Sequence, residues 1–370
     1  MEKKILFIVN VDWFFISHRL PIAIKALDAG YDVHIACAIT NKKELLENLG
    51  LQVHPVSLKR SGTSILEEFI ALKELWSIVK KVNPDVSHAV TIKGVIYGGL
   101  VTRLLRVKRR IASISGLGYI FIDSSFKPRL LKFFIKIFYK FALGKDSLVI
   151  FQNNNDKQIF VEGNIINESQ SILIRGSGVD LDKFKFLPEP NTKKTVMFLA
   201  RLLKDKGLIE FYKASEIVKK TQNARFVLVG DIDPDNPNSI TEDELNTYVN
   251  NGLEHWGYSK SVQSLIPKSH LIVLPSYREG LPKSLLEAAA CGRAVVTTDV
   301  PGCRDAIEPN VTGLLVKVKD HEDLARMIQK LLSNDNLRKK FGAAGRSLAE
   351  ECFSIDDVVA KHLKIYRGDN

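Results

Sequence analysis

The chain has 370 residues, 45% of them hydrophobic and 26% charged, which excludes one small domain and wholesale disorder and is typical of two domains. A formal net charge of +11 points to an anionic partner or ligand. Four cysteines lie far apart without a CxxC pair, so the sequence indicates neither a disulfide framework nor a zinc site, and it predicts a reducing compartment.

The first half alternates short apolar runs with amphipathic stretches, which predicts βαβ units around a parallel sheet. The opening run is broken by Asp12 and lacks a small-residue cleavage site, so we interpret it as a buried strand and not as a signal peptide. No stretch approaches the roughly 20 apolar residues of a spanning helix, so any membrane contact is expected to be peripheral. The predicted strands are residues 4–11, 32–38, 85–90, 110–115 and 147–152, and the predicted helix is residues 65–82.

The positive charge is concentrated in residues 1–165, which carry +10 of the net +11. Within them, residues 126–141 place basic side chains three or four positions apart, on one helical face, with phenylalanines and isoleucine on much of the remainder. These basic residues are Arg129, Lys132, Lys136 and Lys140. Together with the basic run at residues 103–110, this pattern predicts that residues 103–141 dock on an anionic membrane surface. The alternative is a core helix with a basic, solvated face.

Regularity lapses at residues 163–178, where we place the join between two domains. The alternation then resumes, and it predicts a second parallel sheet. The predicted strands are residues 195–201, 225–230, 271–276, 294–298 and 313–316, and the predicted helices are residues 208–220, 283–291 and 320–332. Ligands of such sheets bind at the carboxyl ends of the strands, near a topological switch point.

The most informative segment is LPSYREGLPKSLLEAAACGRAVVTT, residues 274–298. A strand ends there, a loop carries Glu279, and Pro282 stands in the expected first turn of a helix, whose free N–H groups can bind a phosphate. Glu287 follows eight residues after Glu279, so the two carboxylates can accept hydrogen bonds from hydroxyls on two different sugar rings. The alternative is a surface loop with a solvated helix glutamate.

A second segment, FLARLLKDKG, places Arg201 directly after a strand and Lys206 in the following loop. A guanidinium and an ammonium that converge from one loop suit a diphosphate, whose oxygens gain negative charge as a nucleotide leaves. Taken alone, such a pair is more often simply solvated, but its combination with the two glutamates is specific.

These two segments resemble the signature of the retaining, nucleotide-sugar glycosyltransferases of family 4. The resemblance covers essentially the whole chain and implies the α/β fold called GT-B, two facing Rossmann-like doubly wound domains with an interdomain cleft. It implies an acceptor-binding and membrane-docking domain at residues 1–165, completed by the C-terminal helix at 353–370, and a donor-binding domain at residues 166–352.

The resemblance also implies the roles of the site residues. Arg201 and Lys206 are expected to hold the diphosphate of a UDP-sugar and, with Glu279, to be the catalytic residues. Glu287 is expected to bind the ribose hydroxyls. The donor sugar and phosphate are expected to contact Glu279 and the backbone of Gly280, Leu281 and Pro282.

Several further segments, among them SHRLPIAIKAL and FVLVGDIDPDNPNS, resemble bacterial members of the family that add N-acetylgalactosamine to an undecaprenyl-diphosphate-linked sugar. This resemblance implies a lipid-linked acceptor and a peripheral location on the cytoplasmic face of the bacterial inner membrane. Arg19 and Lys93 are the candidates for the acceptor diphosphate, with a solvated surface role as the alternative. One departure is Ser115-Gly116, where many family members have a His-Gly pair; His88 and His18 are other histidines of this half, each more often a packed or solvated residue.

No metal or other cofactor is expected. Asp231, Asp233, Asp235 and Glu242 have a superficial calcium-loop spacing, but Asn236 replaces the required glycine, and we interpret the segment as a polar connection. Two other functions stay open: a UDP-sugar epimerase of the same fold, which needs no membrane, and a nucleic-acid-binding protein that uses the basic half. Against nucleic acid, the aromatic residues of that half lie in an apolar helix and not on a stacking platform.

Overall fold

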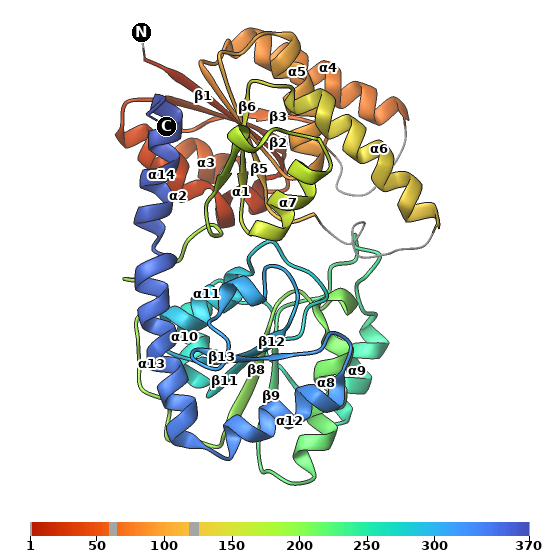
Figure 1. Ribbon diagram of the computed structural model, residues 1–370, viewed down its shortest axis with the longest axis vertical. Helices are drawn as coiled ribbons and strands as arrows, with labels where there is room; N and C mark the ends of the chain where they lie inside the picture. Colours follow the sequence, from red (N-terminus) through yellow and green to blue (C-terminus); the bar gives the residue numbers. More distant parts are fainter. Residues whose placement is uncertain (1, 59–64, 118–125, 370) are drawn as a thin grey trace. The chain divides into compact units, whose positions relative to one another are not determined.

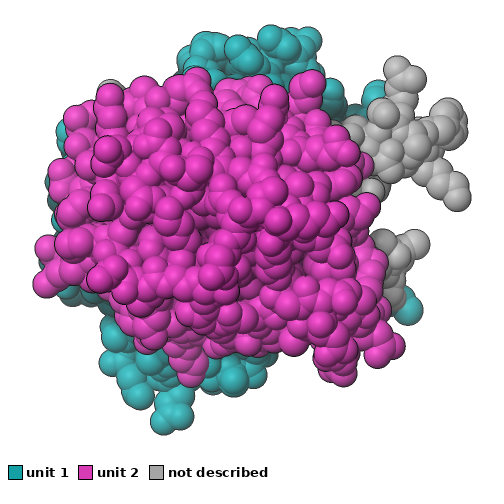
Figure 2. Space-filling model, turned by 90° about the horizontal axis from the view of Figure 1, so that it is seen from below, with its two compact units in different colours: residues 1–177, 356–370 teal, residues 178–355 magenta. Residues whose placement is uncertain are grey.

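The computed structural model describes residues 2–58, 65–117 and 126–369, except for the side chains of Ile65 and of residues 126–132. The chain splits into two compact units, Met1–Ser177 with Asp356–Asn370, and Gly178–Ile355 (Figure 2). The change between units therefore lies beyond the expected position at 165/166. The reason is strand β7 (Ser171–Leu173), which pairs in parallel with β6 (Ser147–Phe151) and so belongs to the first sheet.

The first unit is a seven-stranded parallel sheet in the order β3-β2-β1-β4-β5-β6-β7, with helices on both faces (Figure 1). Successive side chains of a strand point to opposite faces, and β1 (Lys4–Val11) shows this directly. Leu6 and Ile8 belong to one core cluster, and Phe7 packs on the other face against the rings of Phe15 and Tyr366. The sheet is thus buried on both faces, as the near-continuous apolar runs predict.

The other strands of this unit are β2 (Asp32–Ala38), β3 (Gln52–Pro55), β4 (Val86–Val90) and β5 (Arg109–Ile114). Its helices are α1 (Asp12–His18), α2 (Leu20–Asp28), α3 (Lys43–Asn48), α4 (Ile65–Val82), η1 (Gly94–Gly98), α5 (Gly99–Leu104), α6 (Phe126–Leu143), α7 (Asn154–Glu162) and α14 (Ile355–Arg367).

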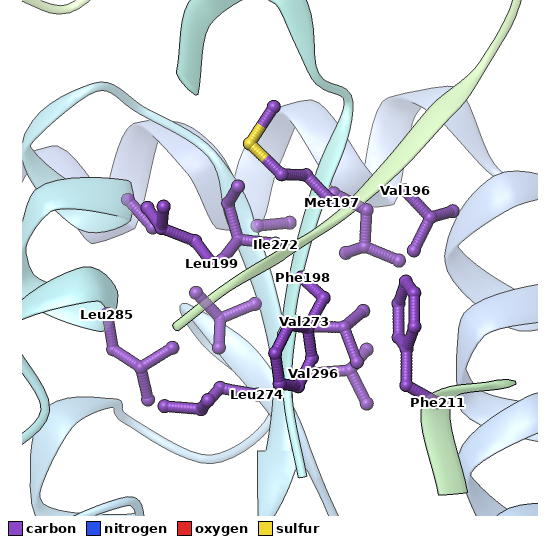
Figure 3. Close-up of a cluster of buried hydrophobic side chains, with 14 of the residues drawn as sticks. Val196, Met197, Phe198, Leu199, Phe211, Ile272, Val273, Leu274, Leu285 and Val296 are labelled. Atoms are coloured by element: carbon purple, nitrogen blue, oxygen red, sulfur yellow. The ribbon is translucent and has the colours of Figure 1, made fainter. Parts of the chain in front are cut away.

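The second unit is a six-stranded parallel sheet in the order β10-β9-β8-β11-β12-β13. Its core is formed by the central strands and the helices that cover them, with Phe198 against Phe211 at 5.4 Å between ring centroids (Figure 3). The strands are β8 (Thr195–Leu199), β9 (Arg225–Val229), β10 (Glu254–His255), β11 (Leu271–Leu274), β12 (Ala294–Thr298) and β13 (Gly313–Val316). The helices are α8 (Leu208–Lys219), α9 (Glu242–Asn250), α10 (Val262–Leu265), α11 (Lys283–Ala290), α12 (His321–Leu332) and α13 (Asp335–Cys352).

The prediction of two parallel α/β sheets is confirmed, and each predicted strand and helix is present within three residues at either end. The strands that were not predicted, β3, β7 and β10, are short and lie at sheet edges, where less apolar surface is needed. Helix α12 begins where the Asp320 carboxylate accepts a hydrogen bond from the Asp323 backbone N–H at 2.9 Å.

Candidate functional site

Two loops at the carboxyl edge of the second sheet come together, one after β8 and one after β11. The Lys206 ammonium forms an ion pair with Glu279 Oε1, although the two residues lie 73 positions apart. Ser276 Oγ donates to the same carboxylate at 2.6 Å, and the Tyr277 backbone N–H donates to the Asp205 carbonyl at 2.9 Å. The structure therefore joins the two segments that the sequence analysis had singled out separately.

Two glycines allow this close approach of backbones. Gly207 has φ +77°, and a Cβ at this position would lie 2.1 Å from the Pro275 carbonyl oxygen. Gly302 has φ +82°, and a Cβ there would lie 2.4 Å from the Glu279 carbonyl oxygen. Only glycine fits both the conformation and the space, so the loops that carry Lys206 and Glu279 are held by backbone packing.

Arg201 has a partner that the sequence analysis did not assign. Its guanidinium forms an ion pair with Asp233, within the acidic segment that we had interpreted as a polar connection. Two backbone hydrogen bonds fasten this segment to the loop after β8: Leu202 N–H donates to the Asp231 carbonyl at 3.0 Å, and Lys204 N–H to the Asn238 carbonyl at 2.8 Å. The clue in the sequence was a carboxylate in the segment that follows the neighbouring strand β9, which ends at Val229.

Glu279 and Glu287 have different surroundings. Glu279 carries the Lys206 ion pair, whereas Glu287 is almost fully buried in α11, with Lys283 Nζ at 3.7 Å. Burial raises the pKa of Glu287 to about 7, against the opposing effect of Lys283 and Lys183. Pro282 is the residue before the helix and not part of its first turn, because its ψ of 119° is extended.

The loop positions of the second unit also include Gly280 and the buried Leu281, between Glu279 and the start of α11. Beneath the ion pair, burial raises the pKa of Asp205, and Lys206 opposes this shift. Tyr277 donates its hydroxyl proton to Glu210 at 2.9 Å. Asp205, Tyr277 and Glu210 were not predicted, because single polar residues carry no periodic signal.

The two acceptor candidates lie in the first unit, at different depths. Arg19 is 2% exposed, and its guanidinium donates to Ser177 Oγ at 3.2 Å and Ser115 Oγ at 3.3 Å. Burial lowers the pKa of Arg19 to about 10. Lys93 is about one-fifth exposed and forms an ion pair with Glu68 at 2.5 Å. Arg19 is thus a packed residue that supports the Ser115 loop, where an open loop position had been expected.

The histidines named beside these candidates are packed as well. His88 is fully buried, and its ring nitrogens lie 2.7 Å from Tyr366 Oη and 2.7 Å from Ser113 Oγ. His18 lies 2.5 Å from Ser17 Oγ and stacks on Phe14. Among the described residues, no group of three or more His, Cys, Asp or Glu side chains could hold a metal ion.

Helix α6 combines a buried and an exposed face. Ile135, Tyr139 and Leu143 belong to the core of the first unit, so the helix is a core element on its inner side, contrary to the expectation of a docking helix outside the core. Its outer side exposes the phenylalanines Phe133, Phe134, Phe138 and Phe141, each about half exposed or more. Lys136 is half-buried and Lys140 exposed, and the side chains of Arg129 and Lys132 lie outside the described residues. In the described parts of the chain, no helix is long and apolar enough to cross a membrane.

Comparison with known families and proteins gives consistent matches to both units. Residues 180–348 match the family model "Glycosyl transferases group 1", and residues 4–153 match "Glycosyl transferase 4-like". The N,N'-diacetylbacillosaminyl-diphospho-undecaprenol alpha-1,3-N-acetylgalactosaminyltransferase of Campylobacter jejuni is 30% identical over 95% of this chain and 97% of its own length. An Escherichia coli UDP-Gal:alpha-D-GlcNAc-diphosphoundecaprenol alpha-1,3-galactosyltransferase is 24% identical over 82% of this chain and 80% of its own.

Two solved structures share the fold over nearly their whole length. The sucrose-phosphate synthase of Thermosynechococcus elongatus has a TM-score of 0.81 at 18% identity and covers 100% of this chain and 99% of its own. Anabaena HepE, solved in complex with UDP-glucose, has a TM-score of 0.77 at 18% identity and covers 98% of this chain and 99% of its own.

Proposed function

The chain belongs to glycosyltransferase family 4 and has the GT-B fold, and on that premise we propose that it transfers a hexosamine from a UDP-sugar to an undecaprenyl-diphosphate-linked sugar. The proposed sugar is N-acetylgalactosamine, transferred with retention of configuration in the assembly of a bacterial surface glycan. The family and fold expected from the sequence are confirmed, and the donor and acceptor are the proposal.

The observation that carries this proposal is the paired arrangement of cations at the carboxyl edge of the second sheet. Lys206 and Arg201 each lie beside a carboxylate, Glu279 and Asp233, in the unit that matches the group 1 family model. A donor diphosphate is a stronger anion than either carboxylate and can replace both as the partner of these cations. The cations then stabilise the charge that develops on the leaving UDP, and this charge is largest in the transition state.

Sugar recognition is assigned to the two glutamates and the start of α11. We assign Glu279, with the backbone of Gly280, Leu281 and Pro282, to the donor sugar and phosphate. We assign Glu287 to the ribose, whose hydroxyls would donate hydrogen bonds to its carboxylate. A nearly buried carboxylate discriminates strongly between ligands, because a ligand that lacks the hydroxyl leaves the carboxylate without a hydrogen-bond partner.

The acceptor is proposed from the names of the two curated relatives, each of which acts on a diphosphoundecaprenol-linked sugar. A polyprenyl acceptor places the reaction at a membrane, and we propose the cytoplasmic face of the bacterial inner membrane. The docking surface would consist of the exposed phenylalanines of α6 and the basic side chains within residues 103–141. Lys93 is the more accessible candidate for the acceptor diphosphate, and Arg19 supports the neighbouring Ser115 loop.

We propose that the reaction needs no metal ion, because Arg201 and Lys206 supply the positive charge at the diphosphate. Activity is then expected to persist in EDTA. Loss of activity on chelation, with recovery on adding manganese or magnesium, would show that the diphosphate is held by a metal in addition to these residues.

The decisive experiment is a matrix of UDP-sugars against short polyprenyl-diphosphate-linked sugars, read by mass spectrometry. The expected product is the acceptor plus one N-acetylhexosamine, formed best from UDP-N-acetylgalactosamine. Conversion of the UDP-sugar to its epimer without any acceptor would reassign the protein as an epimerase. Absence of UDP binding together with salt-sensitive binding of RNA or DNA would favour the nucleic-acid alternative.

A further inference from the structure

The first unit has a cavity of about 420 Å³ that borders the proposed docking surface, because Arg103, Lys140 and Phe141 belong to both. It lies between the end of α6, helix α5 and the chain that follows α7. Three cationic side chains line it, those of Arg103, Lys140 and Lys145, and three side-chain amides, those of Asn164, Asn167 and Gln170. Among its described lining residues there is no carboxylate, so the cavity concentrates positive charge.

The walls of this cavity are held in place before any ligand arrives. Arg103 donates to the Phe141 carbonyl, and Gly144, at φ +59°, leaves room for the guanidinium, since a Cβ there would lie 3.0 Å from Arg103 Cζ. Gln170 Nε2 donates to the Gly144 carbonyl at 2.9 Å, and Gln170 Oε1 accepts from the Asn167 backbone N–H at 2.9 Å. A preformed site loses little conformational entropy when it binds.

The rim of the cavity is apolar and faces solvent. Phe141, which lines the cavity, is 64% exposed, and Phe138, one turn earlier on α6, is 53% exposed. Leu104, next to Arg103 on α5, is 59% exposed. Phosphate-binding groups and an uncovered aromatic surface are therefore contiguous, and this combination matches an amphiphile with an anionic head and hydrocarbon tails.

We propose that this cavity binds the phosphate of an anionic glycerophospholipid, with the acyl chains lying along Phe138 and Phe141. Arg103, Lys140 and Lys145 bind the phosphate oxygens, and the side-chain amides of Asn164 and Asn167 bind the remaining headgroup oxygens. This inference rests on the proposed function at a membrane surface and refines it. The protein then binds one lipid molecule in a defined site, in addition to its general electrostatic attraction to the anionic leaflet.

The test uses the full chain and dihexanoyl phosphatidylglycerol below its micellar concentration, which offers the head group without a membrane. Calorimetry is expected to show saturable binding of one lipid per protein. The double variant Lys140→Gln with Lys145→Gln removes two exposed charges of the cavity and should weaken this binding at least tenfold. The control, Lys25→Gln with Lys43→Gln, removes two exposed lysines that lie elsewhere in the unit, and it should change binding less than twofold.

A second measurement uses phosphatidylcholine vesicles with 20% phosphatidylglycerol. The cavity variant should sediment with them much less than the control variant, and equal losses for both variants would mean that only net charge matters and would overturn the site. Displacement of the short lipid by a polyprenyl-diphosphate sugar would also overturn it, since the cavity would then belong to the acceptor. Transfer to a short soluble acceptor separates the two proposals: an active enzyme that binds no phosphatidylglycerol refutes the lipid site alone.

Discussion

At the scale of single residues, the proposed donor site rests on two cations, Arg201 and Lys206, each of which would exchange its carboxylate partner for the donor diphosphate. Replacing Arg201 by alanine removes one of them and should lower kcat/KM by a factor on the order of 10², the typical cost of losing one group that stabilises transition-state charge. The measurement is steady-state kinetics with varied UDP-sugar. Lys204→Ala is the matched control, because Lys204 lies in the same loop but pairs with Glu244 at 2.9 Å. Equal losses in both variants would contradict the assignment of Arg201.

Glu287 provides a prediction of pH dependence at the same site. Its pKa is raised to about 7, so the folded protein without ligand carries a large fraction of the neutral acid at pH 6 and of the carboxylate at pH 8. Because the carboxylate accepts hydroxyl hydrogen bonds better, the affinity for UDP should rise between pH 6 and pH 8.

The control for this prediction is Glu287→Gln, in which no group titrates at that position. UDP itself also ionises near pH 6 and affects both proteins alike, so the difference between their pH profiles reports Glu287. Titration calorimetry at the two pH values gives the affinities. Identical profiles for the parent and the variant would mean that Glu287 does not contact the nucleotide as a carboxylate.

At the scale of elements, the loop after β8 is positioned by its contact with the end of β11. Gly207→Ala introduces a Cβ 2.1 Å from the Pro275 carbonyl oxygen and also strains φ, so it should lower the free energy of unfolding by about 2 kcal/mol or more and weaken UDP binding. Gly257→Ala is the control, because Gly257 has a similar φ of +69° but only a side-chain oxygen at 3.9 Å. The free energy of unfolding is measured in urea. An equal loss in both variants would mean that the backbone strain at positive φ accounts for the effect, and that the close approach to Pro275 does not.

The elements also show which parts of the molecule a sequence can predict. The strands that end at Leu199 and Leu274 are apolar except for Thr195, so their position, and that of the residues directly after them, follows from the sequence pattern alone. The ion pair of Arg201 with Asp233 depends on which strands are neighbours, and the sheet order β9-β8-β11 cannot be predicted from any local sequence pattern. The burial of Arg19 likewise depends on Ser115 and Ser177, which are distant in sequence.

Helix α6 shows the same limit of prediction from sequence. Its periodicity correctly predicts a helix with separate apolar and basic positions. It does not say that Ile135 and Tyr139 are taken up by the core while Phe138 and Phe141 are left exposed, because all four are apolar. Tertiary packing against α5 and η1 decides which of them a membrane could reach.

At the scale of the whole molecule, the chain folds into two units that each have a core of their own. The first unit is completed by the last helix, α14, which returns to it from the far end of the sequence. Tyr366 of α14 is hydrogen-bonded to His88 at 2.7 Å, and His362 stacks on His88 at 5.7 Å between ring centroids. The stability of the first unit therefore depends on the ionisation of buried histidines that join its two chain segments.

The final prediction concerns the pH dependence of this stability. Burial, with the nearby Arg19 cation, lowers the pKa of His88 well below its ordinary value and that of His362 to about 3. Both are thus neutral in the folded protein, while the unfolded chain binds protons near pH 6.5. Their contribution to the free energy of unfolding is complete above pH 6.5 and is lost as the pH falls toward the pKa values of the folded state. The loss is about 1 kcal/mol for each histidine between pH 7 and pH 5.5.

The variant His362→Gln removes one of these protonations and should lose about 1 kcal/mol less than the parent over the same interval, as measured by urea unfolding at the two pH values. Glu287, whose pKa is raised by burial, acts in the opposite direction, since its penalty is relieved as the pH falls below 7. That effect is common to the parent and the variant and cancels in their difference. If His362→Gln and the parent lose the same stability on acidification, the histidines do not take up protons on unfolding, and the attachment of α14 is not sensitive to pH.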